Sequence, residues 1–246
     1  MRTVNFRDEV MYVVARKMGI DPTMDFPPDL AESYVDFINL AVKKLYPLYD
    51  WPEWTFIEQR TPAAHYIDWA QAGQSAIGRV LKVYCRDPQT TDGIVDIPFS
   101  LSSAGIFCGF EHGTNVWLKY IKPAPQYSAT VWASGTTYPL NGLTYEPTGG
   151  NSYISIQAAN TNHAPATNPT WWTLVDFPEQ IVVQAIRLAY AEALREDGQN
   201  EKADAEEKMA FDEAQAGANI LVHPSYDPIT DQSRTAPRYR AVGATP

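Results

Sequence analysis

The apolar positions near the start of the chain recur at the spacing of an α-helix. Residues 5–18 form one such stretch, with Asn5 as its expected cap and Gly19 as its end. A second stretch begins at Pro28 or the residue after it and stops before Pro47, two places where proline is common. The pattern therefore predicts two N-terminal helices. Their apolar faces consist of Phe6, Val10, Val13 or Val14 and Met18, and of Leu30, Tyr34, Phe37, Ile38, Ala41, Val42 and Leu45.

Helical spacing returns near the end of the chain. Residues 179–197 are expected to form one helix, Gly198 breaks it, and a second helix is expected over about residues 200–216. An amphipathic helix needs a partner for its apolar face, so we expect the first of these helices to pack against the N-terminal pair. The residues expected at that contact are Val182, Ile186 and Tyr190.

Between the helical ends, the apolar pattern alternates as in β-strands. Residues 105–110 and 115–121 are expected to be two strands joined by a hairpin turn at 111–114. In the second of these strands, Val116, Leu118 and Tyr120 should share one face, because successive side chains point to opposite sides. The other expected strands lie within residues 51–61, 78–87 and 93–101.

Residues 127–175 differ in composition from both flanking regions. They are almost uncharged, rich in Thr, Asn, Pro and Gly, and contain seven of the chain's tyrosines and tryptophans. Short strands such as 143–146 and 152–158 alternate with polar loops. We interpret this stretch as a small β module inserted between the strands and the C-terminal helices, and we expect it to be separable.

The last residues, from Pro224 onward, show neither a helical nor a strand period. Such a segment buries too little surface to offset its ordering entropy, so any order must come from a partner. A frayed terminus is one interpretation. A tail that docks is the other, favoured by widely spaced apolar residues and by basic ones that could meet acidic groups. The residues concerned are Tyr226, Ile229, Arg234, Arg238, Tyr239, Arg240 and Val242.

More than half of the net charge of −10 lies where the two C-terminal helices are predicted. Nine acidic and three basic residues lie between Glu192 and Glu213, a net charge of −6. We interpret adjacent carboxylates such as Glu206 and Glu207 as a solvated face. A protein with this charge lacks the basic footprint that nucleic-acid binding requires. An acidic surface near DNA would repel it, which helps only if DNA must slide past.

The motifs of common catalytic and cofactor sites are not found in this sequence. It contains no GxSxG, no Gly-rich phosphate loop and no HExxH. Three aspartates, Asp87, Asp92 and Asp96, do not follow the spacing of a calcium-binding loop. We therefore predict no catalytic residue, no metal site and no cofactor. The scattered histidines are His65, His112, His163 and His223.

No run of apolar residues approaches the length of a membrane span, and the charged start does not resemble a secretory signal. The sequence therefore predicts no membrane partner. Overall the patterns predict an α+β fold, with a helical bundle built from the N- and C-terminal helices and a β-rich middle. The expected divisions are 1–126 for the N-terminal helices and strands, 127–175 for the inserted module, 176–223 for the C-terminal helices and 224–246 for an extended arm.

The inserted stretch resembles the small aromatic β modules of chitin- and cellulose-binding proteins. The resemblance rests on a Tyr-Pro start, a Tyr-led strand, a polar loop ending in proline and a closing tryptophan. In that family exposed aromatic faces stack on sugar rings; the alternative is that these rings form the module's own core. The matching positions are Tyr138, Tyr145, Tyr153, Pro165 and Trp172, and Trp171 is a further candidate for sugar stacking.

The remainder resembles the head-to-tail adaptor proteins of tailed bacteriophages. Two N-terminal helices, a strand at 54–56, a strand-rich middle and the helix junction near residues 193–203 carry this resemblance. It implies a ring of twelve copies below the portal, with a C-terminal arm on the portal. The inserted module departs from the plainest members of that family.

The expected function is thus that of a structural virion protein at the head-tail junction, made in the host cytoplasm. Its expected partners are the portal protein, a tail or nozzle protein below the ring, further copies of itself, and double-stranded DNA that passes without specific binding. The rival hypothesis is a carbohydrate-binding or host-recognition protein acting through residues 127–175. An enzyme without a recognisable motif is a third, weaker option.

Overall fold

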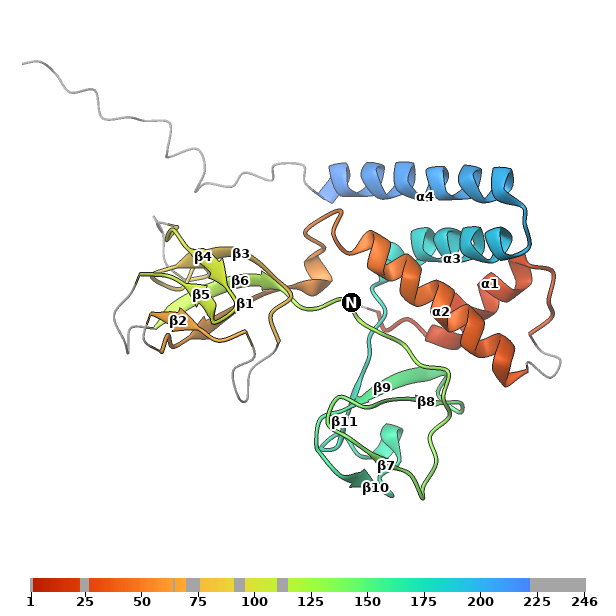
Figure 1. The fold of residues 1–246 in the computed structure, drawn as a ribbon, viewed down its shortest axis with the longest axis horizontal. Coiled ribbons are helices and arrows are strands. Elements are labelled where there is room, and N and C mark those ends of the chain that lie inside the picture. The colour runs from red at the N-terminus through yellow and green to blue at the C-terminus, as the bar shows by residue number, and fades with distance from the viewer. Residues whose placement is uncertain are drawn as a thin grey trace, which may run out of the picture. The chain divides into compact units, whose positions relative to one another are not determined.

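A computed structural model describes most of the chain as a mixed α and β protein with small antiparallel sheets, which confirms the predicted mixture of helices and strands (Figure 1). The chain divides into two compact units. The first unit combines Met1–Glu53 with Ala124–Asn219, and the second combines Trp54–Pro123 with Ile220–Pro246. The described residues are 2–22, 27–63, 65–69, 76–90, 96–109 and 115–221.

The helices of the first unit come from both ends of the chain, close to the predicted positions. The N-terminal stretch starts as a π-helical turn, η1, which the sequence did not indicate, and continues as α1. The predicted cap is confirmed, because the Asn5 side chain accepts a hydrogen bond from the amide of Asp8 at 2.9 Å. The bounds are η1 (Phe6–Met11), α1 (Tyr12–Lys17), α2 (Pro28–Leu45), η4 (Glu179–Ile181), α3 (Val182–Glu196) and α4 (Asn200–Leu221).

Helix α3 packs against the N-terminal helices, as its apolar pattern predicts. Ile186 and Tyr190 are buried, and α3 contacts η1, α1 and α2. Val182 is only half-buried. Two cations lie near the ring of Tyr190: Lys17 of α1 is 5.1 Å from the ring centre, and Lys202 of α4 is 5.4 Å from it. Figure 1 shows α4 running alongside α3. None of the described helices is long and apolar enough to cross a membrane.

The inserted stretch of the first unit forms two small sheets. One has the strand order β11-β9-β8 and the other pairs β10 with β7. The two strands predicted within it are confirmed as β8 and β9, which form an antiparallel pair. The bounds are β7 (Thr137–Tyr138), β8 (Leu143–Glu146), β9 (Asn151–Ser155), β10 (Asn160–Thr161), η3 (Pro165–Thr167) and β11 (Trp172–Leu174).

The second unit contains two three-stranded antiparallel sheets, with strand orders β1-β6-β3 and β2-β5-β4. The predicted alternation of β6 is confirmed, since Val116, Leu118 and Tyr120 are buried and pack with Ile67 and Ile106 of the other sheet. The bounds are β1 (Thr55–Arg60), β2 (Tyr66–Ile67), β3 (Arg79–Tyr84), β4 (Ser100–Ser102), β5 (Gly105–Phe107) and β6 (Val116–Ile121), with the short helix η2 (Pro52–Trp54) before β1.

The hairpin predicted between residues 105–110 and 115–121 is wrong. Strand β5 pairs with β2 and β4, whereas β6 pairs with β1 and β3, so the two belong to different sheets. The predicted turn at 111–114 lies outside the described residues. Turn-like residues between two apolar runs indicate a change of direction, but they do not determine which strands pair.

Candidate functional site

Three of the five aromatic residues proposed for sugar stacking are buried in the inserted module. Tyr138 and Trp172 meet edge to face with ring centroids 5.0 Å apart, and the Trp172 indole donates a hydrogen bond to the carbonyl of His163 at 2.7 Å. Tyr145 is also buried, and burial raises its pKa to about 12. In this structure these rings form the core of the module, so no face of theirs is open to a sugar.

The other two candidates, Tyr153 and Trp171, are half-buried. Trp171 stacks on the ring of His163 with centroids 3.9 Å apart and planes within 11°. The amide of Ile156 donates a hydrogen bond to the Trp171 carbonyl, and Ile156 is itself exposed. Sugar binding stays a prediction. Of the five candidates, only Trp171 and Tyr153 are exposed enough to stack on a sugar ring.

A stack of aromatic rings joins the base of the module to the N-terminal helix. The ring of Tyr127 lies parallel to Phe6 with centroids 4.6 Å apart, and Phe177 lies 5.1 Å from it. The Asn39 side chain binds both the amide and the carbonyl of Tyr127, at 2.8 and 3.0 Å. Burial raises the pKa of the Tyr127 hydroxyl well above its ordinary value, and that hydroxyl donates to the carbonyl of Asp176 at 3.0 Å.

Sequence reasoning missed this contact, because single aromatic residues at distant positions have no period that links them. The predicted module begins at Tyr127, but the structure places this residue in the core of the first unit. The division at 127 stays a prediction. A cut made at that residue would remove a ring from between Phe6 and Phe177.

The π-helical start of the chain also holds the turn between β8 and β9. The Arg7 amide donates to the Gly150 carbonyl at 2.9 Å, and the Arg7 guanidinium donates to the carbonyl of Pro147 at 2.6 Å. The Asn5 side chain donates to the carbonyl of Gly149 at 2.9 Å. Gly150 has a φ of +69°, and a Cβ there would lie 2.8 Å from the side-chain oxygen of Asn5. This turn is therefore built to fit the N-terminal segment closely.

A cluster of ion pairs ties α2, α3 and α4 together. The Lys44 ammonium of α2 lies 2.6 Å from Glu192 of α3 and 2.7 Å from Glu207 of α4. Arg195 of α3 pairs with Glu192 at 2.7 Å, with Asp204 at 3.0 Å and also with Glu207. Desolvation opposes the ionisation of Glu207, but hydrogen bonds from Lys44 and Arg195 outweigh it and hold the pKa of Glu207 below its ordinary value.

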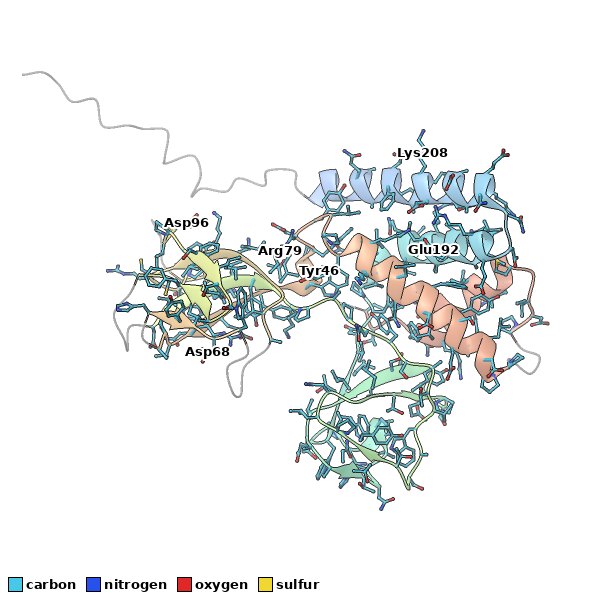
Figure 2. All side chains as sticks on the ribbon, viewed as in Figure 1. Tyr46, Asp68, Arg79, Asp96, Glu192 and Lys208 are labelled. Carbon is cyan, nitrogen blue, oxygen red and sulfur yellow. The ribbon has the colours of Figure 1, made fainter. Side chains whose placement is uncertain are left out.

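A second group of ion pairs lies further along the same helices. Arg187 of α3 reaches Glu206 at 2.9 Å and Glu213 at 3.0 Å, both on α4. The interpretation of Glu206 and Glu207 as a solvated face is therefore wrong, since both carboxylates point toward cations of the neighbouring helices. Figure 2 shows Lys208 directed away from α3, on the exposed side of α4.

The proposed arm residues lie outside the described part of the chain. These are Tyr226, Ile229, Arg234, Arg238, Tyr239 and Arg240. Within the residues that the structure describes, no group of three or more His, Cys, Asp or Glu side chains is placed to hold a metal ion. No family model, no curated protein and no solved structure matches this chain.

Proposed function

We propose that this protein is a structural part of a tailed-phage virion: an adaptor whose copies form a ring between the portal and the tail and let DNA pass. In this proposal the helices of the first unit are the helical bundle of the adaptor body. Residues 127–175 are a module inserted into it, and residues 224–246 are the arm that reaches the portal. A tail or nozzle protein would bind below the ring.

The observation that carries this proposal is that helices from the two ends of the chain pack together and end in α4. Ion pairs fix α4 to α2 and α3, and the last residue of α4 is Leu221. The sequence that follows has three arginines against two aspartates, so it reverses the sign of the acidic helix before it. A rigid helical base followed by a segment that can fold on a partner suits assembly onto a ring.

Imaging the protein mixed with portal rings tests the proposal. The expected result is an added ring of density, and its absence at saturating protein would overturn the proposal. Deletion of Thr230–Pro246 should prevent incorporation; unchanged incorporation and unchanged salt sensitivity would show that the arm is dispensable.

Within the arm, we expect the aromatic residue to contribute more than any single charge. Tyr239→Ala should weaken incorporation more than Arg238→Gln, because aromatic anchors dominate interfaces and an exposed ion pair contributes about 0–1 kcal/mol. Titration of labelled protein onto immobilised portal rings measures both variants. A larger loss for Arg238→Gln would contradict this order.

The second candidate function is sugar binding through the inserted module. The observation that favours it is the half-buried Trp171, stacked on His163 beside the exposed Ile156. A glycan array with the intact protein tests it. Binding that Trp171→Ala abolishes and Trp171→Phe retains would support it, whereas an array without signal would reject it.

A further inference from the structure

The β1-β6-β3 sheet presents two lysines directly opposite each other. Lys82 of β3 and Lys119 of β6 are register partners, so their side chains leave the same face of the sheet. This face lies opposite the one that contributes Val116, Leu118 and Tyr120 to the buried core. Two of its own members, Tyr84 and Ile121, are also buried. Like charges directly opposite each other in a sheet are destabilising, so the arrangement calls for an anionic partner.

Part of that charge is balanced within the second unit. Lys82 pairs with Asp96 at 3.0 Å, and both side chains are more than a third exposed. No ion pair of Lys119 occurs among the described residues. Two half-buried apolar residues lie on the same face. Trp117 is two residues before Lys119 on β6, and Ile57 of β1 is the register partner of Lys119. We call Ile57, Lys82, Trp117 and Lys119 the basic face. Tryptophan is enriched in protein interfaces, and the lysines beside it give this face a charge that an acidic partner complements.

A complementary surface exists on the outward side of α2. Asp29, Glu32 and Asp36 follow one another at helical spacing, all three are exposed, and no ion pair involves them in the part of the chain that the structure describes. Leu40 continues the same line and is 40% exposed. We call these four residues the acidic stripe. It combines carboxylates with an apolar side chain, as the basic face combines lysines with Trp117.

The distribution of charge between the two units favours this pairing over a nucleic acid. The ranges 1–53 and 124–219 hold ten lysines and arginines against 21 aspartates and glutamates, a net charge of −11. Residues 54–123 hold six of each, so they are neutral overall. A second copy of the chain therefore supplies a strongly acidic surface, whereas DNA approaching the whole protein would be repelled.

We propose that the basic face of one copy binds the acidic stripe of a second copy. The two surfaces differ, so the contact is head-to-tail and leaves one free surface of each kind at the ends of any open assembly. Repeating the contact produces a closed ring if the rotation between neighbouring copies permits closure. This inference rests on the proposed ring-forming function and names the surfaces that would build the ring.

Sedimentation of the full chain over a range of concentrations and salt tests the contact. The wild type should associate reversibly at low ionic strength, and the association should weaken as salt is added because screening reduces the attraction between exposed charges. Lys119→Glu on the basic face and Asp36→Lys on the acidic stripe should each weaken self-association at least tenfold. Lys208→Glu, the same charge change on exposed α4, is the control and should associate like the wild type.

Mixing the two variants distinguishes a head-to-tail contact from a general charge effect. Lys119→Glu keeps its acidic stripe and Asp36→Lys keeps its basic face, so one contact can form between them and the mixture should stop at dimers. A mixture that stays monomeric, or a wild type that stays monomeric at low salt, would overturn the proposal. So would association that Lys119→Glu leaves unchanged while it weakens binding of a DNA duplex.

The portal experiment separates this inference from the proposed function. If the wild type forms a ring on portals and the charge-reversal variants form it equally well, the surfaces named here are wrong and the adaptor proposal stands. If the variants lose self-association in solution and the wild type never joins a portal, the contact stands and the adaptor proposal fails.

Discussion

At the scale of single residues, Ile186 and Val183 lie nearly one turn apart on α3 in opposite surroundings. Ile186 is 7% exposed and Val183 is 55% exposed. Ile186→Asp would bury an unpaired charge among helices, and we expect the free energy of unfolding to fall by about 3 kcal/mol or more. Val183→Asp places the same charge in solvent and should change it by less than about 0.5 kcal/mol. Urea unfolding of both variants measures the difference, and equal effects would place Ile186 at the surface.

Gly150 provides a second test at this scale, because a side chain there would meet two obstacles: a left-handed backbone and the close approach of the N-terminal segment. Its φ is +69°, and a Cβ would lie 2.8 Å from Asn5 and 3.0 Å from Arg7. Gly19 has a φ of +79° with no atom within 4 Å of such a Cβ. Gly19→Ala should therefore cost only the left-handed backbone, about 1–2 kcal/mol, and Gly150→Ala should cost more.

The additional loss of stability in Gly150→Ala, relative to Gly19→Ala, measures how strongly the N-terminal segment stabilises the module. Thermal unfolding of both variants gives the comparison. Faster hydrogen exchange in residues 5–11 should accompany the Gly150 change and be missing from the Gly19 change. If the two substitutions have equal effects, the contact between the turn and the N-terminal segment is weaker than its hydrogen bonds indicate.

At the scale of elements, the ion pairs make the docking of α4 sensitive to pH. The pKa of Glu207 is lower in the folded protein than its ordinary value of about 4.3. Ionised Glu207 therefore stabilises the fold above that value, and this contribution is lost as the pH falls through the lowered pKa. Glu207→Gln should reduce the free energy of unfolding by on the order of 1 kcal/mol at neutral pH, and its difference from the wild type should narrow below about pH 4.

Asp212→Asn is the matched control for this prediction, since Asp212 is an exposed carboxylate on the same helix with no ion pair among the described residues. Asp212→Asn should leave the free energy of unfolding nearly unchanged, both at neutral pH and below about pH 4. Denaturant titrations of the three proteins between pH 3 and pH 8 provide the measurement. An equal effect of the two substitutions would show that total charge, and not the cluster around Lys44, sets the stability of α4.

The helices were the most predictable elements, and strand pairing was the least. Helix α2 repeats its apolar spacing over several turns, which specifies both its existence and its buried face. Strand β5 has an apolar pattern too, but nothing in that pattern identifies β2 and β4 as its neighbours. The π-helical turn at Phe6–Met11 has no sequence signature of its own, so it was predicted as ordinary helix.

The candidate sites divide in the same way. The sequence did not indicate the ion pairs of Glu206 and Glu207, because their cations lie on other helices. The spacing of residues along α4 gives no information about those helices. The sequence groups the aromatic residues of the module as candidates for sugar stacking, and the structure buries three of the five. Which of them form its core depends on strand register, and register places Trp172 beside buried Ser155.

At the scale of the whole molecule, residues 54–123 of the second unit are inserted into the first through two adjacent connections. The Lys122 amide donates to the Trp54 carbonyl at 3.0 Å, and the Lys122 ammonium lies 3.8 Å from the ring centre of Phe56. The ends of this unit are thus held close together within it. Joining Glu53 to Ala124 by a short Gly/Ser linker should therefore leave a folded first unit, because a short closed loop adds little entropy cost.

Circular dichroism and thermal unfolding measure this outcome. The shortened chain should keep a cooperative transition with a larger helical signal per residue than the wild type. Removal of Tyr127–Val175 is the contrasting deletion. The sequence predicts that it leaves a folded helical body, and it should lower the unfolding temperature more than the first deletion does, because it takes Tyr127 from its place beside Phe6 and Phe177. Aggregation of the first deletion with survival of the second would reverse the division between the units.

The wide separation of the helices along the chain has a consequence for synthesis. Helix α2 ends at Leu45, and its partner α3 begins at Val182, about 137 residues later. At roughly 5–20 residues per second, the ribosome needs about 7–27 s to make that stretch. During that interval the buried face of α2, which includes Ile38, Ala41 and Val42, lacks its contact with α3. Residues 54–123 can fold in the meantime. A stalled or truncated chain would therefore expose the N-terminal apolar face, and we expect holding chaperones to bind it there.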